Sequence, residues 1–344
     1  MTTDPLRADV AIIGAGPVGL FAIFECGMLG LACHVFDALE VPGGQCAALY
    51  PEKPIFDIPA HPRILGAELV ERLMEQAAPF KPIFHMGQQV VALSRKNEDR
   101  WLVESGDGTR LDVAAVVVAA GVGAFGPNRP PLDGIEQYEK KAAGRGVQYL
   151  VTRREDYRGR RVVIAGGGDS AVDWALSLSE IAAHVSVVHR RPKFRAAPES
   201  VRRLTELAAG GAIDLVVPFQ LHGLEGEEGE LGAIVVSDLD GHQRRLPADA
   251  LLPFFGLSQN LGPVAQWGLD LYRSHVQVDP VTCDAGRPGI FAIGDIATYP
   301  GKQKLILTGF AEATTAAHAI FPLARPGEVL HFEYSTTRGV PGRV

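Results

Sequence analysis

The stretch Ala8-Asp-Val-Ala-Ile-Ile13, which leads directly into Gly14-Ala-Gly16-Pro-Val-Gly19, decides the fold of this chain. An apolar strand, a glycine turn and a helix-forming segment in this order are typical of a dinucleotide-binding βαβ unit. The helix continues to about Gly30, and a second strand, Ala32–Phe36, ends at Asp37. The glycine turn and the helix amino terminus suit a pyrophosphate, and an acid at the end of the second strand suits the hydroxyls of a ribose. This unit is therefore predicted to bind FAD or NAD.

The same pattern occurs a second time. The strand Arg161–Ala165 runs into Gly166-Gly-Gly168-Asp-Ser-Ala171, and a helical stretch continues to about Ala183. The next strand, His184–Val188, ends at His189-Arg190-Arg191. A glycine motif that occurs twice, each time between a strand and a helix, is much stronger evidence than one isolated match.

The two units differ in the residue that closes the second strand. Asp37 follows Gly14 by 23 positions, and His189 follows Gly166 by the same 23 positions. Guanidinium groups pair with phosphate through two parallel hydrogen bonds, so arginines at this position favour a nucleotide with a 2′-phosphate. Lys193 and Arg195 add positive charge after His189. The second unit is therefore predicted to bind NADPH.

Two further segments indicate a flavin. Gly289–Ile296 is an apolar strand that ends in Gly-Asp, and Asp295 is placed to hydrogen-bond a polyol such as the ribityl chain of FAD. Gly43-Gly44-Gln45 follows Asp37, and its backbone can approach a flavin ring. Tyr50 can stack on that ring. These segments favour FAD over NAD in the first unit.

The remaining strands define the layout. Asp112–Ala120 and Ala248–Phe255 read as apolar strands, and the Gly- and Pro-rich Gly121–Pro131 reads as a linker. The predicted fold class is α/β, with two Rossmann-like, three-layer dinucleotide-binding domains. The FAD-binding domain is predicted to be discontinuous, 1–123 and 255–344, with an NADPH-binding domain of 124–254 inserted into it.

Composition excludes several function classes. The net charge of −7 argues against nonspecific nucleic-acid binding. The apolar run at Ala114–Ala120 is too short to span a bilayer, and Met1–Arg7 does not resemble a signal peptide. The four cysteines have neither CxxC nor metal-ligand spacing, which predicts reduced thiols and no metal. A cytoplasmic location without membrane attachment is expected.

Together these motifs resemble the thioredoxin-reductase-like (type 2) ferredoxin–NADP reductases over nearly the whole chain. The matching segments are Gly43-Gly44-Gln45 with Leu49–Lys53, Gly121–Pro127, Gly166–Ala175, His189–Arg195, Asn260–Pro263, Gly294–Lys302 and Thr308–Ala316. The resemblance implies a homodimer with noncovalent FAD. It also implies that NADPH reduces the flavin, which passes single electrons to a ferredoxin or flavodoxin.

The resemblance also implies cofactor contacts, which join those argued from the motifs. The predicted FAD contacts are Gly14, Gly16, Pro17, Val18, Gly19, Asp37, Gly44, Gln45, Tyr50, Val90, Phe125, Asp295 and Thr336. The predicted NADPH contacts are Gly166, Gly168, Asp169, Ser170, Ala171, His189, Arg190, Arg191 and Arg195. Tyr50 and Tyr334 are predicted to stack on the flavin, Tyr334 and Thr336 from the partner subunit. No other catalytic residue is predicted, because the cofactor carries the chemistry.

Alternative activities remain at this point. A thioredoxin reductase needs a redox CxxC in the NADPH domain, and no cysteine lies between Gly121 and Gly168. A glutathione-reductase-like disulfide would need a partner for Cys46 at position 51, which is Pro51. A single-cysteine flavoprotein reductase, a quinone or diaphorase-type reductase and a noncatalytic NADPH sensor stay open.

Overall fold

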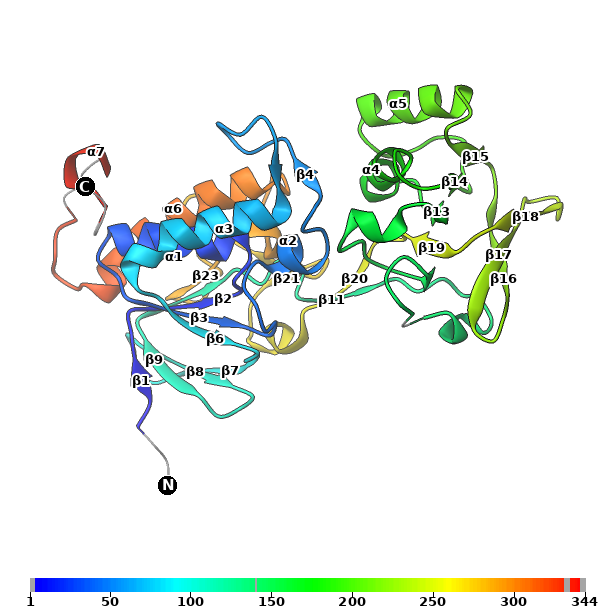
Figure 1. The fold of residues 1–344 in the computed structure, drawn as a ribbon. Coiled ribbons are helices and arrows are strands. Elements are labelled where there is room, and N and C mark those ends of the chain that lie inside the picture. Colours follow the sequence, from blue (N-terminus) through cyan, green and yellow to red (C-terminus); the bar gives the residue numbers. More distant parts are fainter. Residues whose placement is uncertain (1–3, 140, 331–334, 341–344) are drawn as a thin grey trace. The chain divides into compact units, whose positions relative to one another are not determined.

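The computed structural model of the 344-residue chain describes residues 4–139, 141–330 and 335–340, without the side chains of 124–127, 257–259, 335 and 338. The chain divides into two compact units. The first comprises Met1–Phe125 and Gln259–Val344, and the second comprises Gly126–Ser258. The second unit is thus an insertion into the first (Figure 1).

The first unit is built around a parallel sheet of five strands. Their order is β23 (Ile290–Ala292), β10 (Ala115–Val118), β2 (Val10–Ile13), β3 (Cys33–Asp37) and β6 (Ile83–Met86). The chain begins this sheet at β2, adds strands on one side, and then returns to add β10 on the other. The strand order therefore reverses between β2 and β10, which is the place where α/β sheets bind ligands, at the carboxyl ends of the strands.

Helices cover one face of this sheet and a second sheet covers the other. The helices are α1 (Pro17–Met28), α3 (Gly66–Ala77) and α6 (Ile306–Ala324) (Figure 1). The second sheet has the order β1 (Leu6–Arg7), β9 (Arg110–Val113), β8 (Trp101–Ser105) and β7 (Val90–Arg95). Each face has its own apolar core, so the unit has the predicted three layers.

The prediction of one strand over Asp112–Ala120 was wrong. The segment forms the end of β9 in one sheet and the whole of β10 in the other. Ala114 lies between them, and the backbone N–H groups of Ala114 and Ala115 both donate to the carbonyl of Asp9, at 3.0 and 3.1 Å. The residues on either side of this change, from Val113 to Val118, are all buried and apolar, so the apolar run continues across the change of sheet and the pattern hides it.

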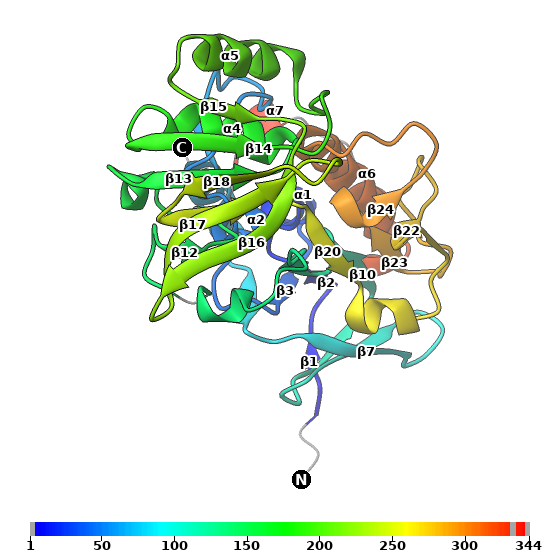
Figure 2. The same cartoon turned by 90° about the vertical axis from the view of Figure 1, so that its right-hand side faces the viewer.

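The second unit repeats this plan. Its parallel sheet has the order β12 (Gly146–Val147), β19 (Ala250–Pro253), β13 (Arg161–Ala165), β14 (His184–Val188) and β15 (Asp214–Val216). The helices α4 (Asp169–Leu178) and α5 (Pro198–Ala209) belong to it, as does an antiparallel sheet of β16 (Gln220–Glu227), β17 (Glu230–Ser237) and β18 (Gln243–Pro247) (Figure 2). As in the first unit, the first strand of the βαβ pattern is central. Both Rossmann-like domains of the predicted fold are therefore present.

The connections between the units are short strands. Ala124–Pro127 forms β11, inside the predicted linker, and its neighbour is β20 (Leu257–Asn260). The remaining short elements of the first unit are α2 (Gly44–Ala48), α7 (Ser335–Arg338), β4 (Pro54–Ile55), β5 (Ile64–Leu65), β21 (Leu271–Tyr272), β22 (His275–Gln277) and β24 (Ala297–Thr298). Among the described residues, no helix combines the length and apolar character that crossing a bilayer requires.

Candidate nucleotide-binding sites

The glycine turn after β2 lies at the carboxyl edge of the first sheet. Gly14 has φ +113°, and a Cβ there would lie 2.3 Å from the carbonyl oxygen of Ala119. A Cβ on Gly19 would lie 1.9 Å from the carbonyl oxygen of Gly14. A Cβ on Gly16, by contrast, would meet nothing within 4 Å. The outer glycines are thus required for packing, and the middle one leaves the backbone open to a ligand at the start of α1.

Asp37, at the end of β3, is fixed beside this turn. Its Oδ2 accepts a hydrogen bond from the Ala15 N–H at 2.7 Å, and its Oδ1 accepts one from Leu39 at 2.8 Å. Burial raises the pKa of Asp37, and these two backbone donors oppose that shift. Each carboxylate oxygen has a second lone pair, so Asp37 can still accept hydrogen bonds from a ribose.

Val90 begins β7, close to the strand end that carries Asp37. The N–H of Gln88 donates to the Asp37 carbonyl at 2.9 Å, two residues before Val90. The side-chain oxygen of Gln88 is buried and has no hydrogen-bond partner in the described part of the chain. A buried polar atom without a partner commonly marks a place where a ligand or water binds, so this corner fits a bound nucleotide.

The Gly43-Gly44-Gln45 segment contacts the same turn. The Gly43 N–H donates to the Ala15 carbonyl at 2.8 Å, and a Cβ on Gly44 would lie 3.0 Å from the Cα of Gly16. On the other side, a Cβ on Gly121 would lie 3.5 Å from the amide nitrogen of Gln45. The start of α2, the glycine turn and the end of β10 therefore converge.

The Gly294–Asp295 turn follows β23 and lies close to Tyr50. The negative charge of Asp295 adds to the burial that raises the pKa of both Cys46 and Tyr50. The Cys46 thiol donates to the Tyr50 hydroxyl, with 3.7 Å between sulfur and oxygen. Val18, on α1, packs against Gly294, where an added Cβ would lie 3.4 Å from its side chain. The structure thus places Val18, Tyr50 and Asp295 near one another around this turn.

In the second unit the glycine turn after β13 has the same construction. A Cβ on Gly166 would lie 2.8 Å from the carbonyl oxygen of Phe254, whereas a Cβ on Gly168 would meet nothing within 4 Å. Ala171 is fully buried where α4 packs on this turn. Asp169 accepts a hydrogen bond from the Ala197 N–H at 2.9 Å, which joins the helix start to the loop before α5.

His189 packs directly on this turn. A Cβ on Gly167 would lie 2.2 Å from the His189 ring, which also contacts Phe194 with 5.0 Å between ring centres. Burial lowers the pKa of His189, and the charges of the neighbouring arginines lower it further. Its Nε2 is buried and has no hydrogen-bond partner among the described residues. His189 is thus a neutral ring that supports the turn, with one nitrogen open to a ligand.

The arginines that follow β14 are exposed. Arg190, Arg191 and Arg195 form no ion pair within the described residues. Arg161 and Arg202 of the same unit pair with Asp249 and with two glutamates. The Arg195 N–H donates to the Gly167 carbonyl at 2.7 Å, so the basic loop is fixed to the glycine turn. Free guanidinium groups beside an open helix start suit a phosphate.

A pocket lies beside this loop. Its volume is about 600 Å³. Its mostly apolar lining comes from Pro192, Lys193, Phe194, Ala196, Pro198, Val201, Thr205, Leu215 and Val217. An apolar pocket next to free arginines suits a nucleotide base linked to a phosphate.

The comparisons with known proteins agree with this geometry. Residues 8–319 match the family model described as pyridine nucleotide-disulphide oxidoreductase. The chain belongs to this family. Among curated relatives, the "Ferredoxin--NADP reductase" of Paramagnetospirillum magneticum is 64% identical, covering 97% of this chain and 98% of the relative. The protein of the same description from Rhodospirillum rubrum is 62% identical, covering 99% and 98%.

A solved structure supports the fold. Thioredoxin reductase from Lactococcus lactis matches with a TM-score of 0.78 at 22% identity, covering 92% of this chain and 99% of that one. The resemblance to thioredoxin-reductase-like ferredoxin–NADP reductases is therefore confirmed at the level of family and fold. This chain is a pyridine nucleotide-disulphide oxidoreductase family member with two complete dinucleotide-binding units.

The family description refers to disulphide chemistry, but position 51, where a disulfide partner of Cys46 would stand, is Pro51. All four cysteines are free and buried. Cys46 is the one beside Tyr50, and burial raises the pKa of its thiol to about 11. A thiol with this pKa is almost entirely protonated at neutral pH, and the thiolate is the nucleophile. The interpretation of Cys46 as a small buried residue therefore fits the structure better than a single-cysteine cycle.

The remaining predicted residues are described to different extents. Pro17 is the first residue of α1, and Ser170 is exposed in the first turn of α4. Phe125 lies in β11 but its side chain is outside the described residues, as is the whole of Tyr334. Thr336 is exposed in α7. The stacking by Tyr334 and the contacts of Phe125 and Thr336 stay predictions.

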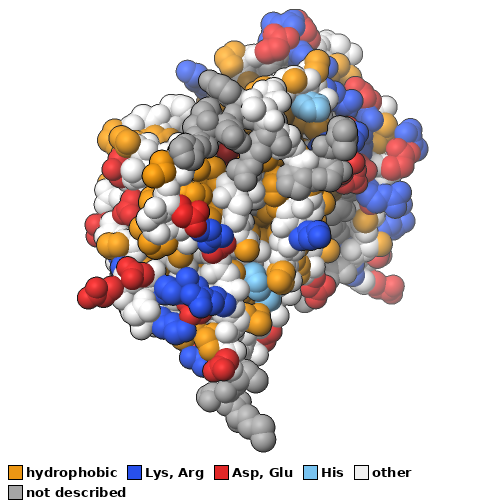
Figure 3. Space-filling view, turned by 90° about the vertical axis from the view of Figure 1, so that its left-hand side faces the viewer, with side chains coloured by type: hydrophobic (Ala, Val, Ile, Leu, Met, Phe, Trp, Pro, Cys, Tyr) orange, Lys and Arg blue, Asp and Glu red, His pale blue; other side chains and the backbone are white. Residues whose placement is uncertain are grey.

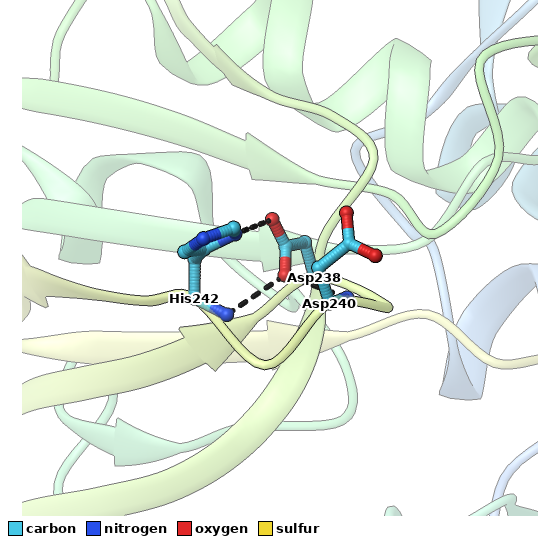
Figure 4. A group of neighbouring side chains, drawn as sticks. All are labelled: Asp238, Asp240 and His242. Carbon is cyan, nitrogen blue, oxygen red and sulfur yellow. Dashed lines mark hydrogen bonds and ion pairs between the residues drawn. The ribbon is translucent and has the colours of Figure 1, made fainter.

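One group of acidic and histidine side chains has the composition of a metal-binding cluster. Asp238, Asp240 and His242 lie at the turn between β17 and β18 (Figure 4). Asp238 accepts hydrogen bonds from the backbone N–H groups of Asp240 and His242, at 3.0 and 2.8 Å, and from the His242 ring at 3.0 Å. These bonds account for the cluster as a turn closed by an aspartate.

Sequence reasoning missed two polar residues of the first site, Gln88 and Glu312. The Gly294 N–H donates to the carboxylate of Glu312 at 2.7 Å. A single glutamate within the apolar helix Ile306–Ala324 was the available signal, because an acid is seldom buried unless it has partners.

Proposed function

We propose that this protein is an FAD-dependent ferredoxin–NADP reductase, which moves electrons between NADPH and a small one-electron carrier protein. The observation that carries the proposal is that two similar βαβ units end in residues of opposite charge. One βαβ unit is closed by a fixed aspartate, and the other by arginines that form no ion pair in the part of the chain that the structure describes. The names of the curated relatives support the same activity.

The first unit fits FAD. Open backbone at Gly16 would face the pyrophosphate, Asp37 the adenosine ribose, and Asp295 the ribityl chain. Tyr50 would lie against the flavin ring, with Gln45 at the edge of the ring. FAD held by these residues would supply the redox chemistry between a two-electron hydride donor and a one-electron carrier. The protein positions the reactants and supplies no acid or base.

The second unit fits NADPH. The N–H groups at the start of α4 would bind the pyrophosphate, and Arg190, Arg191 and Arg195 the 2′-phosphate. His189 keeps the turn in shape as a neutral ring, so it adds no positive charge of its own. Residues 124–254 are accordingly proposed as the NADPH domain, and 1–123 with 255–344 as the FAD domain.

We also infer that the working molecule is a cytoplasmic homodimer. Four free, buried thiols suit a reducing compartment. Half-buried aromatic rings of α1 and α6 contact each other, with 4.8 Å between the ring centres of Phe21 and Phe310, and Leu307 of α6 is 44% exposed. Figure 3 shows hydrophobic side chains between charged ones on one face. Such apolar surface suits contact with a second subunit, and analytical ultracentrifugation tests it.

The decisive experiment is NADPH-driven reduction of a panel of acceptors by the purified protein. The panel contains a ferredoxin, a flavodoxin, a thioredoxin and quinones. The expected result is a yellow protein that releases FAD on denaturation, reduces ferredoxin or flavodoxin, and leaves thioredoxin unreduced. Turnover with quinones alone would instead assign a diaphorase-type reductase. Reduced flavin without turnover on any acceptor would assign an NADPH sensor.

A further inference from the structure

A buried ion pair lies next to the Gly294–Asp295 turn. Lys302 and Glu312 form it, and their side chains are 4% and 5% exposed. The Tyr299 hydroxyl also donates to Oε1 of Glu312, at 2.7 Å. Enclosing two charges is unfavourable unless they pair and make further hydrogen bonds. Glu312 satisfies this condition, since both of its oxygens have partners.

The second oxygen of Glu312 acts on the turn itself. Oε2 accepts the hydrogen bond from the Gly294 N–H at 2.7 Å, one residue before Asp295. Gly294 has φ +75°, a left-handed conformation that few other residues adopt. In this conformation the Gly294 N–H donates to the carboxylate of a residue of α6.

Val18 fixes the same turn from the other side. A Cβ on Gly294 would lie 3.4 Å from Val18, and a Cβ on Gly309 of α6 would lie 2.3 Å from it. The two glycines therefore let α1 and α6 approach each other closely around Val18. The turn that carries Asp295 is held between the helix that starts at the first glycine motif and the helix that carries Glu312.

We propose that Glu312 is a positioning residue for the flavin. It holds the Gly294 N–H and so sets the place of Asp295, while Lys302 and Tyr299 keep its carboxylate oriented. The inference rests on the proposed function, because it takes Asp295 to bind the ribityl chain of FAD. According to this proposal, Glu312 contributes to FAD affinity although it lies within an apolar helix.

Two double variants of the full-length protein distinguish the effect of the acceptor for the Gly294 N–H from the effect of the Lys302–Glu312 charges. In Glu312→Gln/Lys302→Met the charges are removed, but an amide oxygen remains for the Gly294 N–H. In Glu312→Leu/Lys302→Met the acceptor is removed as well. Neither leaves a buried charge unpaired, which would itself be destabilising. Glu25→Gln is the control, since Glu25 is a partly buried acid on α1 that interacts with Thr314 of α6.

The measurement is the dissociation constant of FAD for each apoprotein, from quenching of flavin fluorescence, with thermal unfolding of the same apoproteins. The Leu/Met variant is expected to bind FAD roughly tenfold more weakly than the Gln/Met variant, the cost of leaving the buried Gly294 N–H without an acceptor. Glu25→Gln is expected to bind like the wild type. If the Leu/Met variant does not fold, Tyr299→Phe serves, with an expected loss of roughly threefold.

Two results would overturn the proposal. Equal FAD affinity in the two double variants would show that the Gly294 hydrogen bond does not position the flavin. Unchanged affinity in Tyr299→Phe would do the same where that variant is used. A wild-type apoprotein that binds no FAD would instead refute the proposed function, and the inference with it.

Discussion

At the residue scale, the two nucleotide sites differ by a few side chains at equivalent positions. Asp37 was identifiable from the sequence because its spacing from Gly14 is fixed by the βαβ geometry, and the same holds for Arg190 and Arg191. Glu312 was not identifiable, since its role depends on contacts with Gly294, Tyr299 and Lys302 that no spacing rule gives. Spacing within one motif is local, whereas contacts between segments require the fold.

Nucleotide choice is expected to depend on Arg190 and Arg191. Each charge-assisted contact to a 2′-phosphate is worth roughly 1.5–3 kcal/mol, and 1.4 kcal/mol is tenfold in affinity. Replacing both residues with glutamine should weaken NADPH by roughly a hundredfold at low salt and leave NADH nearly unchanged. The dependence of the stopped-flow rate of flavin reduction on NADPH or NADH concentration measures both affinities.

The matched control is Arg202→Gln, an exposed arginine of the same unit that pairs with Glu199 and Glu206. It should keep the NADPH preference. The wild-type preference should also shrink as salt rises, because phosphate pairing is screened. Retained discrimination in the double variant would place the phosphate elsewhere.

Cys46 should be dispensable for turnover. Its pKa of about 11 leaves little thiolate at neutral pH, and its side chain is buried. Cys46→Ala should keep NADPH-dependent reduction of a dye acceptor within roughly twofold of the wild type, since only surrounding packing changes. Iodoacetamide should modify the native wild type slowly at pH 8. Loss of turnover in a folded, FAD-replete variant would restore the thiol mechanism.

At the element scale, the two strands that flank the second glycine motif were predicted most closely, whereas the predicted strand Ala248–Phe255 is shorter, Ala250–Pro253. Arg161–Ala165 and His184–Val188 are β13 and β14 with the predicted bounds. The run Asp112–Ala120 failed, because two buried strands in succession leave no polar residue at the change of sheet. The glycine motif thus made the strands beside it predictable. Hydrophobicity alone could not show where one buried strand ends and the next begins.

The first glycine turn allows a test of element packing against ligand binding. Gly16→Ala should leave the stability of the apoprotein within about 0.5 kcal/mol of the wild type, since its Cβ meets nothing within 4 Å. It should nevertheless weaken FAD, because the Cβ enters the space where the pyrophosphate approaches. Gly19→Ala should destabilise the apoprotein itself, since its Cβ would lie 1.9 Å from the Gly14 carbonyl. Urea unfolding and FAD titration of both variants make the comparison.

The pairing of β3 with β6 should make stability depend on pH. His34 Nδ1 and His85 Nε2 are 2.9 Å apart, and burial lowers the pKa of both rings. The positive charge of His85 lowers the pKa of His34 further, while Asp107 raises that of His85. Unfolded histidines take up protons near pH 6.5, before the folded rings do. The free energy of unfolding should therefore fall as pH drops below about 6.5 toward the lowered folded pKa values.

Urea unfolding at pH 7.5 and 5.5 tests this dependence. The double variant His34→Asn/His85→Gln should lose less stability than the wild type over this interval. His61→Gln, an exposed histidine of the same unit, should behave like the wild type. An equal loss in all three proteins would assign the pH dependence to other groups.

At the scale of the whole molecule, the repeat of one folding plan was visible in the sequence, and so was the insertion. The structure divides the chain at Phe125 and Ser258, against the predicted 123 and 254. The boundary strands β11 and β20 could not be predicted, because Gly- and Pro-rich segments read as linkers whether or not they pair.

Each unit should respond to its own ligand. Hydrogen–deuterium exchange of the FAD-replete protein, with and without NADP⁺, should show added protection at 166–171 and 189–197. At saturating ligand, about a hundred times the dissociation constant, local stabilisation approaches about 2.7 kcal/mol. The segments 10–19 and 37–50 should change little on NADP⁺ addition and lose protection when FAD is removed. Protection by NADP⁺ confined to 10–19 would reverse the assignment of the two units.

The pairing of β11 with β20 also bears on how such a protein could have arisen. The two ends of the inserted unit leave the first unit as neighbouring, hydrogen-bonded strands. A gene segment that encodes a folded unit with adjacent ends can enter a host protein at a single point and leave the host core intact. On the proposed assignment, the coenzyme preference resides in this inserted unit, which could be exchanged in evolution or in the laboratory for a unit that prefers NADH.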